Sequence, residues 1–361
     1  MGTSCTHKNE VASLQTIHFD ENQLNEITIN DIFSNIEYVQ LELNEDNPIG
    51  AVSHIEVVDD RLFLSDGVAL FEYTTNGMYV NCLKRRGKGP QEYTNISNYA
   101  ISDNHIYIID KNAKLLKYDI DNHDCLATVK LDFYPSACYI TNDNQLLITS
   151  AYQNEGDKFH LFNIDDLSYI NSFQPINVSE TKWRHYMAQQ NFYIYDGKLL
   201  FFEPMNNQVS IVDTKNNEMR PYVELSFSNG NPPKELLTET YKSVFDFNMK
   251  VIEGGYKVGT YGYAETNNHI LFSFYEGDKY YSMLYNKKSK KANSFQRIIF
   301  HNDIPSVHTA AIKYNFKSEK QQYLVIPEHI FFDENDKPYV DGFLSNNVSN
   351  GNPIIAIVEL I

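Results

Sequence analysis

Short apolar runs separated by tight polar turns recur along most of the chain. Residues 36–43 alternate apolar and polar positions, which is the pattern of a strand with one buried face. From residue 52 onward, similar runs are interrupted by Asn, Asp and Gly, as at Asn76-Gly77. Asn-Gly is a strong hairpin signal because both residues tolerate the positive φ that tight hairpins need. The pattern predicts consecutive antiparallel hairpins.

The hairpins group into repeating blocks of four strands. If Asp59, Asp103 and Asn142 occupy equivalent turns, the blocks are spaced by 44 and 39 residues, close to the ~40–45 residues of a propeller blade. Six blocks fit the chain, and the least regular is the last, with runs at 323–332, 338–344 and 354–361. The sequence therefore predicts an all-β fold, a six-bladed β-propeller of four-stranded antiparallel blades.

The ends of the chain are predicted to meet. An open end of the ring would expose a strand edge that invites aggregation, so we expect the strand at residues 36–43 to complete the last blade. Residues 1–35 are polar and mixed, which suggests a loose lead-in or tether, and residues 36–361 form the single propeller domain. Long connections at residues 176–190, 231–247 and 303–322 are candidate binding segments, and the second is predicted to be a short helix capped by Asn231.

Composition limits the partners. A net charge of −17 and a sequence pI of about 5.0 disfavour a nucleic-acid partner. No run approaches the ~20 apolar residues that cross a bilayer, so membrane contact is expected only through a lipid anchor. The four cysteines show neither C-x-x-C nor zinc-ligand spacing. The sequence does not decide whether Cys125 and Cys138 form a disulfide. Cys5 precedes a polar stretch and is a candidate lipidation site; the alternative is an ordinary cytoplasmic start.

Three segments resemble a known family. They are residues 35–42, residues 60–66 and, most specifically, the connector Arg86-Gly87-Lys88-Gly89-Pro90-Gln91-Glu92-Tyr93. Over residues 30–361 the chain resembles the six-bladed β-propeller lipoproteins of Bacteroides-type bacteria, which are NHL-like in architecture. Those proteins usually have Gly where this chain has Gln91. The resemblance implies a periplasmic or outer-membrane protein anchored through Cys5, and it implies no reaction.

The connector is the first candidate ligand site. Arg86 and Lys88 could bind a carboxylate, a sulfate or a uronic acid, while Glu92 supplies an acceptor and Tyr93 a stacking face. The alternative is structural: Glu92 pairs with an arginine and Tyr93 fills a gap between blades. Gly87 and Gly89 are expected to adopt backbone angles closed to other residues.

The second candidate site lies in the connection at residues 176–190. There Trp183, Arg184, His185 and Tyr186 combine flat apolar area with directional donors, which suits a sugar or an aromatic ligand. The alternative is a loop anchored by its tryptophan. A glycine- and tyrosine-rich stretch at residues 254–263 is explained by strand packing, with pocket lining as the alternative.

No catalytic motif is present. The chain lacks H-E-x-x-H, G-x-S-x-G, Walker A and dinucleotide-binding patterns. The acidic stretches at residues 119–124 and 333–336 lack the glycine and closing glutamate of a calcium loop. We therefore expect no cofactor and a non-enzymatic, monomeric binding module at the bacterial cell envelope, whose partner is a glycan, a peptide or an envelope protein. The alternative is a calcium-dependent hydrolase or lyase with its site in the central channel.

Overall fold

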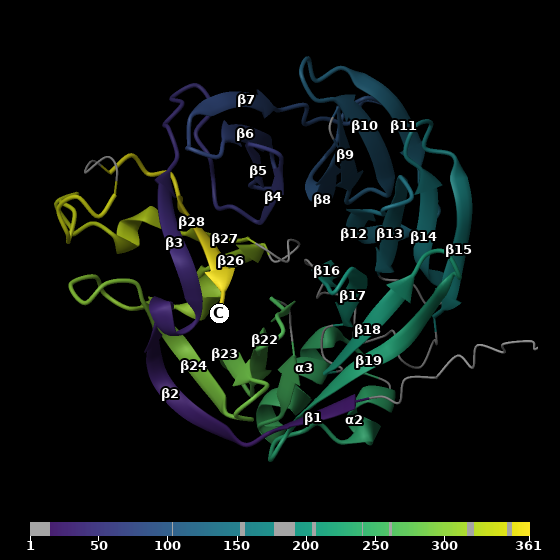
Figure 1. Ribbon diagram of the computed structural model, residues 1–361. Helices are drawn as coiled ribbons and strands as arrows, with labels where there is room; N and C mark the ends of the chain where they lie inside the picture. Colours follow the sequence, from purple (N-terminus) through teal and green to yellow (C-terminus); the bar gives the residue numbers. More distant parts are fainter. Residues whose placement is uncertain are drawn as a thin grey trace, which may run out of the picture.

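The strands are arranged around a ring. The computed structural model describes residues 15–102, 104–151, 156–176, 192–203, 207–239, 241–259, 262–315, 321–344 and 349–361. Their strands form six hydrogen-bonded sheets, which follow one another around the ring in Figure 1. The fold is thus an all-β propeller built from four-stranded antiparallel blades.

Sheets I to III each consist of four consecutive antiparallel strands. Sheet I contains β4 (His54–Val58), β5 (Arg61–Ser65), β6 (Leu70–Thr74) and β7 (Tyr79–Leu83); sheet II contains β8 (Ile96–Ile101), β9 (His105–Asp110), β10 (Lys114–Asp119) and β11 (Cys125–Lys130); sheet III contains β12 (Tyr134–Ile140), β13 (Gln145–Ala151), β14 (Asp157–Asn163) and β15 (Tyr169–Pro175).

Sheets IV to VI each combine one strand from residues 15–40 with strands from later in the chain. Sheet IV contains β16 (Phe192–Tyr195), β17 (Lys198–Glu203), β18 (Gln208–Asp213), β19 (Glu218–Phe227) and β1 (Gln15–Phe19); sheet V contains β20 (Lys257–Gly259), β21 (Ala264–Glu265), β22 (His269–Glu276), β23 (Lys279–Asn286), β24 (Ala292–Ile299), β25 (Val307–His308) and β2 (Glu21–Thr28); sheet VI contains β26 (Lys313–Asn315), β27 (Gln322–Ile326), β28 (Ile354–Leu360) and β3 (Phe33–Gln40).

Strand β3 closes the ring. It pairs with β28 in antiparallel register, with Gln40 opposite Ile354 and Phe33 opposite Leu360. The chain thereby joins its first and last regions without a covalent link. The predicted closure by residues 36–43 is confirmed, with the strand placed at residues 33–40.

The predicted loose lead-in over residues 1–35 was wrong for residues 15–35. Strand β1 pairs in parallel with β19, and β2 pairs in parallel with β24. Together, β1, β2 and β3 form a belt along the outer edges of sheets IV, V and VI (Figure 1). The belt packs against the propeller because a few apolar side chains alternate with polar ones along it. Of these apolar side chains, Ile17, Phe19 and Ile27 are buried.

Two further predictions need correction. The expected helix at residues 231–247 is two helices, α2 (Lys234–Thr238) and α3 (Val244–Gly254), and Ser243 rather than Asn231 caps α3 by accepting from the amide of Asp246. The expected sixth-block run at residues 338–344 is not a strand. Its apolar side chain Phe343 instead packs on Tyr38 of the edge strand β3 and on Phe331. The inner strand of sheet VI is instead β26, inside the predicted connection at residues 303–322.

The core lies between neighbouring sheets. The fully buried Tyr99 of sheet II packs among apolar residues of sheet I, and its hydroxyl lies 2.6 Å from the carbonyl oxygen of Phe63. Buried tyrosines of this kind join blades through apolar area and a directed hydrogen bond. Among the described residues, no helix is long and apolar enough to span a bilayer.

Candidate functional site

Tyr93, predicted as a stacking face, is a buried structural residue. Its side chain is fully buried, and its hydroxyl lies 2.9 Å from the carbonyl oxygen of Leu83 and 3.1 Å from that of Val68. The same hydroxyl accepts from the amide of Arg85, and burial raises the pKa of Tyr93 above its usual value. Tyr93 therefore fills the gap between sheets I and II, as the alternative interpretation proposed.

Glu92 folds over the connector. Its carboxylate accepts from the amide of Gly89 at 2.8 Å rather than pairing with an arginine. A Cβ on Gly87 would lie 1.9 Å from that carboxylate, and neither Gly87 nor Gly89 has a positive φ. The glycines are thus needed for close approach and not, as predicted, for unusual backbone angles.

The cations of the connector remain at the surface. Arg86 and Lys88 are exposed, and Nε of Arg86 donates to the carbonyl oxygen of Thr94 at 3.1 Å. Arg85 lies 3.6 Å from the carboxylate of Asp124. With Glu92 and Tyr93 used in the fold, Arg86 and Lys88 are the two predicted site residues here that can meet a partner.

Cys82, just before the connector, gives a testable prediction. Burial raises the pKa of its thiol to about 11, and the thiolate is the reactive form. At pH 8 we expect iodoacetamide to label Cys82 at least ten times more slowly than in the urea-unfolded chain, since each pKa unit above the labelling pH lowers the thiolate fraction about tenfold. Peptide mass spectrometry measures the rate, and equal rates in folded and unfolded protein would contradict the burial. Cys82, Cys125 and Cys138 form no disulfide with one another.

Several predicted residues fall outside the described part of the chain. They include the group Trp183, Arg184, His185 and Tyr186, as well as Cys5. Within the glycine- and tyrosine-rich stretch, Tyr263 is fully buried and donates to Glu265 at 2.6 Å. This observation agrees with strand packing for Tyr263.

A cavity that the sequence did not predict lies where the ring closes. It measures about 610 Å³ and is walled by sheet VI, the β27–β28 connection and the β3–β4 connection. Its volume is in the range of small-molecule sites, roughly 300–1,000 Å³. We call it the closure cavity; it is lined by Ile49, Gly50, Ala51, Val52, Ala311, Lys313, Val325, Pro327, Glu328, His329, Phe332, Asp333, Asp336, Ser349, Gly351 and Pro353.

Strand pairing explains why these segments meet. Ile326, Ile354 and Gln40 lie side by side at one end of sheet VI, so the connections after β27 and after β3 both leave from that end. On the inner strand, Lys313 is directly opposite Val325. Cross-strand partners project from the same face of a sheet, which places a cation beside an apolar side chain on one wall.

Glu328 fixes the outer wall of the closure cavity. This buried residue begins the short helix η3 (Glu328–Ile330), and its carboxylate accepts from the amides of Asn350 at 2.8 Å and Gly351 at 2.6 Å. It also accepts from the hydroxyl of Ser349 at 2.8 Å. A carboxylate saturated by backbone donors holds the far end of the β27–β28 connection, so the wall is preorganised.

A second carboxylate of the wall is also committed to the fold. Asp333 accepts from the amides of Lys337 at 3.0 Å and Asn335 at 2.8 Å, and these bonds hold the pKa of Asp333 below its usual value. The acidic stretch at residues 333–336 is therefore a turn, as expected. The charged or titratable wall residues that remain for a ligand are Lys313, His329 and Asp336.

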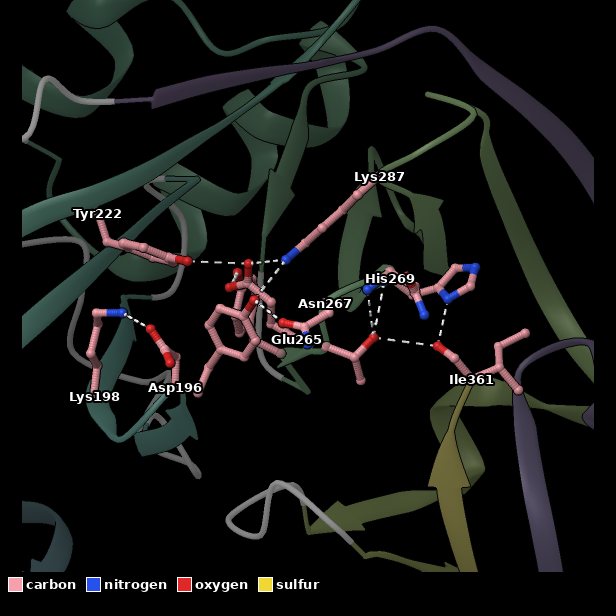
Figure 2. Close-up of polar contacts among 12 residues, drawn as sticks. Asp196, Lys198, Tyr222, Glu265, Asn267, His269, Lys287 and Ile361 are labelled. Carbon is pink, nitrogen blue, oxygen red and sulfur yellow. Dashed lines mark hydrogen bonds and ion pairs between the residues drawn. The ribbon is translucent and has the colours of Figure 1, made fainter.

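A polar network away from the closure cavity joins sheets IV and V. Glu265, whose side chain is 4% exposed, accepts from Lys287 at 2.5 Å and from Tyr222 at 3.2 Å. Figure 2 shows Lys287 and Tyr222 reaching Glu265 from opposite sides, with Ile361 and His269 farther along the same row. Burial raises the pKa of Tyr222 above its usual value. Because Glu265 is saturated by these donors, we interpret the network as a link between blades.

The described residues form no metal site, and the closure cavity left only one signal in the sequence. Over the described ranges, no group of three or more His, Cys, Asp or Glu side chains is placed to hold a metal ion. Sequence reasoning missed the closure cavity because its residues come from three separate segments. The available signal was the irregular sixth block, whose long β27–β28 connection interrupts the regular spacing of strands.

Comparisons with known proteins give a family and a fold. The model of a family described as "Domain of unknown function (DUF4934)" matches residues 14–359. The crystal structure of a presumed exported protein from Bacteroides fragilis is similar, with TM-score 0.72 and 18% identity over 96% of this chain and 100% of that one. Weaker similarity, with TM-score 0.39 and 8% identity, links the chain to BamB from Moraxella catarrhalis over 91% of this chain and 90% of that one. No curated protein sequence matches the chain.

Proposed function

The chain belongs to the DUF4934 family, and we propose that it is an exported β-propeller that binds a small ligand in the closure cavity. The observation that carries the proposal is the preorganised wall: Glu328 and Asp333 are satisfied by backbone donors, while Lys313 and His329 are available to a ligand. A cavity with apolar walls and a few polar groups of this kind is the usual form of a ligand site.

Binding is favoured over catalysis at this site. General acid–base chemistry needs a titratable group positioned to exchange a proton with the substrate. The carboxylates of Glu328 and Asp333 instead hold the surrounding loops. Two further titratable groups of the wall, His329 and Asp336, are exposed, and within the described part of the chain they form no hydrogen bond with each other. The proposed role is therefore that of a binding module, and the exposed Arg86 and Lys88 offer a second, separate surface for an acidic partner.

The proposal includes six blades, one for each sheet. It is supported by the six separate hydrogen-bonded sheets and by the pairing of β3 with β28. A ring closed in this way leaves the closure cavity at the junction of the last and first blades.

The proposal also places the protein at the cell envelope. It is supported by the similarity to a Bacteroides fragilis protein presumed to be exported. The proposed anchor is a lipid on Cys5, as the resemblance to propeller lipoproteins implies.

Two neighbouring alanines offer a matched test of the cavity. Ala310 and Ala311 are both exposed in the short helix η2 (Thr309–Ala311), but only Ala311 is among the cavity-lining residues. Ala311→Trp is expected to occupy part of the cavity and to lower the affinity of bound small molecules at least tenfold, whereas Ala310→Trp should leave that affinity unchanged. A small-molecule library screened by thermal shift provides the ligands, because a ligand that binds only the native state raises Tm.

Two outcomes of this screen would contradict the proposal. One is a library with no binder. The other is a set of binders that are equally tight to wild type, Ala310→Trp and Ala311→Trp, which would place the site elsewhere.

A further inference from the structure

We infer that the ligand of the closure cavity is an organic carboxylate with an apolar body, whose acid group pairs with Lys313. This inference rests on the proposed function and specifies the class of ligand. It follows from which charges on the wall are already used, from the position of Lys313, and from the kind of apolar surface around it.

The polar groups left for a ligand are mostly donors. Lys313 carries three N–H donors, and His329 offers at least one in any protonation state. Among the residues that the structure describes, the side-chain ammonium of Lys313 forms no ion pair or hydrogen bond. The carboxylates of Glu328 and Asp333 already accept backbone donors. A ligand that supplies acceptors therefore matches the wall better than one that supplies donors.

The position of Lys313 strengthens its preference for an anion. It is half-buried on the inner strand β26, opposite the buried Val325. A partly desolvated ammonium without a partner gains more from a carboxylate than an exposed lysine does, because screening by water is reduced. Charge-assisted hydrogen bonds from Lys313 to a ligand carboxylate are expected to raise the affinity for that ligand about 10- to 100-fold.

The remaining surface favours an apolar body over a sugar. Ile49, Val52, Val325, Pro327 and Pro353 provide aliphatic walls, and Phe332 is buried. No tyrosine or tryptophan is among the described lining residues, so the flat amphipathic faces that sugars stack on are missing there. An aliphatic or small aromatic acid fits these walls better than a uronic acid.

One carboxylate of the cavity wall repels an acidic ligand. Asp336 is exposed and lines the closure cavity. Its charge is screened by water more than that of the half-buried Lys313, so it reduces the affinity for an acid without reversing the preference. Asp336→Asn should therefore strengthen the binding of an acid about two- to threefold.

Three probes separate the acid group from the apolar body. Octanoate, octanamide and galacturonate are titrated into the full chain and into the Lys313→Met variant, with binding followed by protein NMR. Octanoate is expected to bind at least tenfold tighter than octanamide and than galacturonate. Lys313→Met keeps an unbranched apolar chain, so it should abolish the difference between octanoate and octanamide while leaving octanamide binding unchanged.

Each alternative outcome has a distinct meaning. Equal affinity for octanoate and octanamide, with both lost in Ala311→Trp, would overturn the carboxylate inference and leave the proposed function standing. Tighter binding of galacturonate would overturn the apolar body. Octanoate binding that survives Ala311→Trp, or no binding of any probe or library compound, would remove both the inference and the cavity site. Melting of each variant without ligand shows that it is folded.

Discussion

Replacing Lys257 with alanine is expected to lower the free energy of unfolding by about 3–5 kcal/mol, which is the cost of removing one partner of a buried ion pair and leaving the other charge buried. The side chain of Lys257 is 2% exposed and forms an ion pair with Glu21 of the belt, whose side chain is 6% exposed. Lys257 also donates to the side chain of Asn229 at 2.9 Å. Without Lys257, the carboxylate of Glu21 would stay buried against sheet V with no cation beside it.

The matched control removes both charges. Lys257 also lies 3.6 Å from the carboxylate of Glu276, whose side chain is 29% exposed and so stays partly hydrated. In the double variant Glu21→Leu and Lys257→Met neither of the two buried charges remains, so we expect a stability close to that of the wild type. Urea denaturation measures both variants. A double variant as unstable as Lys257→Ala would show that packing, and not the unpaired charge, causes the loss.

Replacing Phe19 with alanine is expected to cost about 3–5 kcal/mol, as for a large aromatic side chain removed from a core. Phe19 is fully buried, and its ring lies between sheets IV and V, 5.4 Å from the ring of Phe272 and 5.2 Å from that of Tyr285. The belt would lose its main apolar anchor, and β1 would detach from β19. The urea midpoint should fall clearly.

Its neighbour on the same strand is the control. His18 is exposed, so His18→Ala should change the free energy of unfolding by less than about 0.5 kcal/mol. If Phe19→Ala is as mild as His18→Ala, the belt does not pack against the propeller in solution.

The hairpin turns and the closing strand could be predicted from the sequence, but the first two belt strands could not. Turns such as Asn76-Gly77 and Asp196-Gly197 lie between antiparallel strands, with positive φ at Gly77, Asp196 and Gly197. The preference of these residue types for such turns can be recognised in a single sequence. The closing strand was predictable because its alternation is regular. The first two belt strands were missed because their buried residues are few and their partners lie more than 200 residues away, as with Gln15 and Val223 or Glu21 and Ala292.

The candidate site was less predictable for a different reason. The connector lies between sheets I and II, as the sequence predicted, but its sequence cannot show that Glu92 turns onto Gly89 or that Tyr93 points into the core. The closure cavity depends on three segments meeting at one end of sheet VI. Lys313 stands out only when its surroundings are known, because a lysine in a short strand has no pattern of its own.

The most direct measurement of the central claim is a crystal structure of the full chain soaked with a mixture of small organic acids and their neutral amides. We predict electron density for an acid in the closure cavity, with its carboxylate next to Nζ of Lys313 and its apolar part against Val52 and Val325. Density at other places with an unchanged, ligand-free closure cavity would contradict the account.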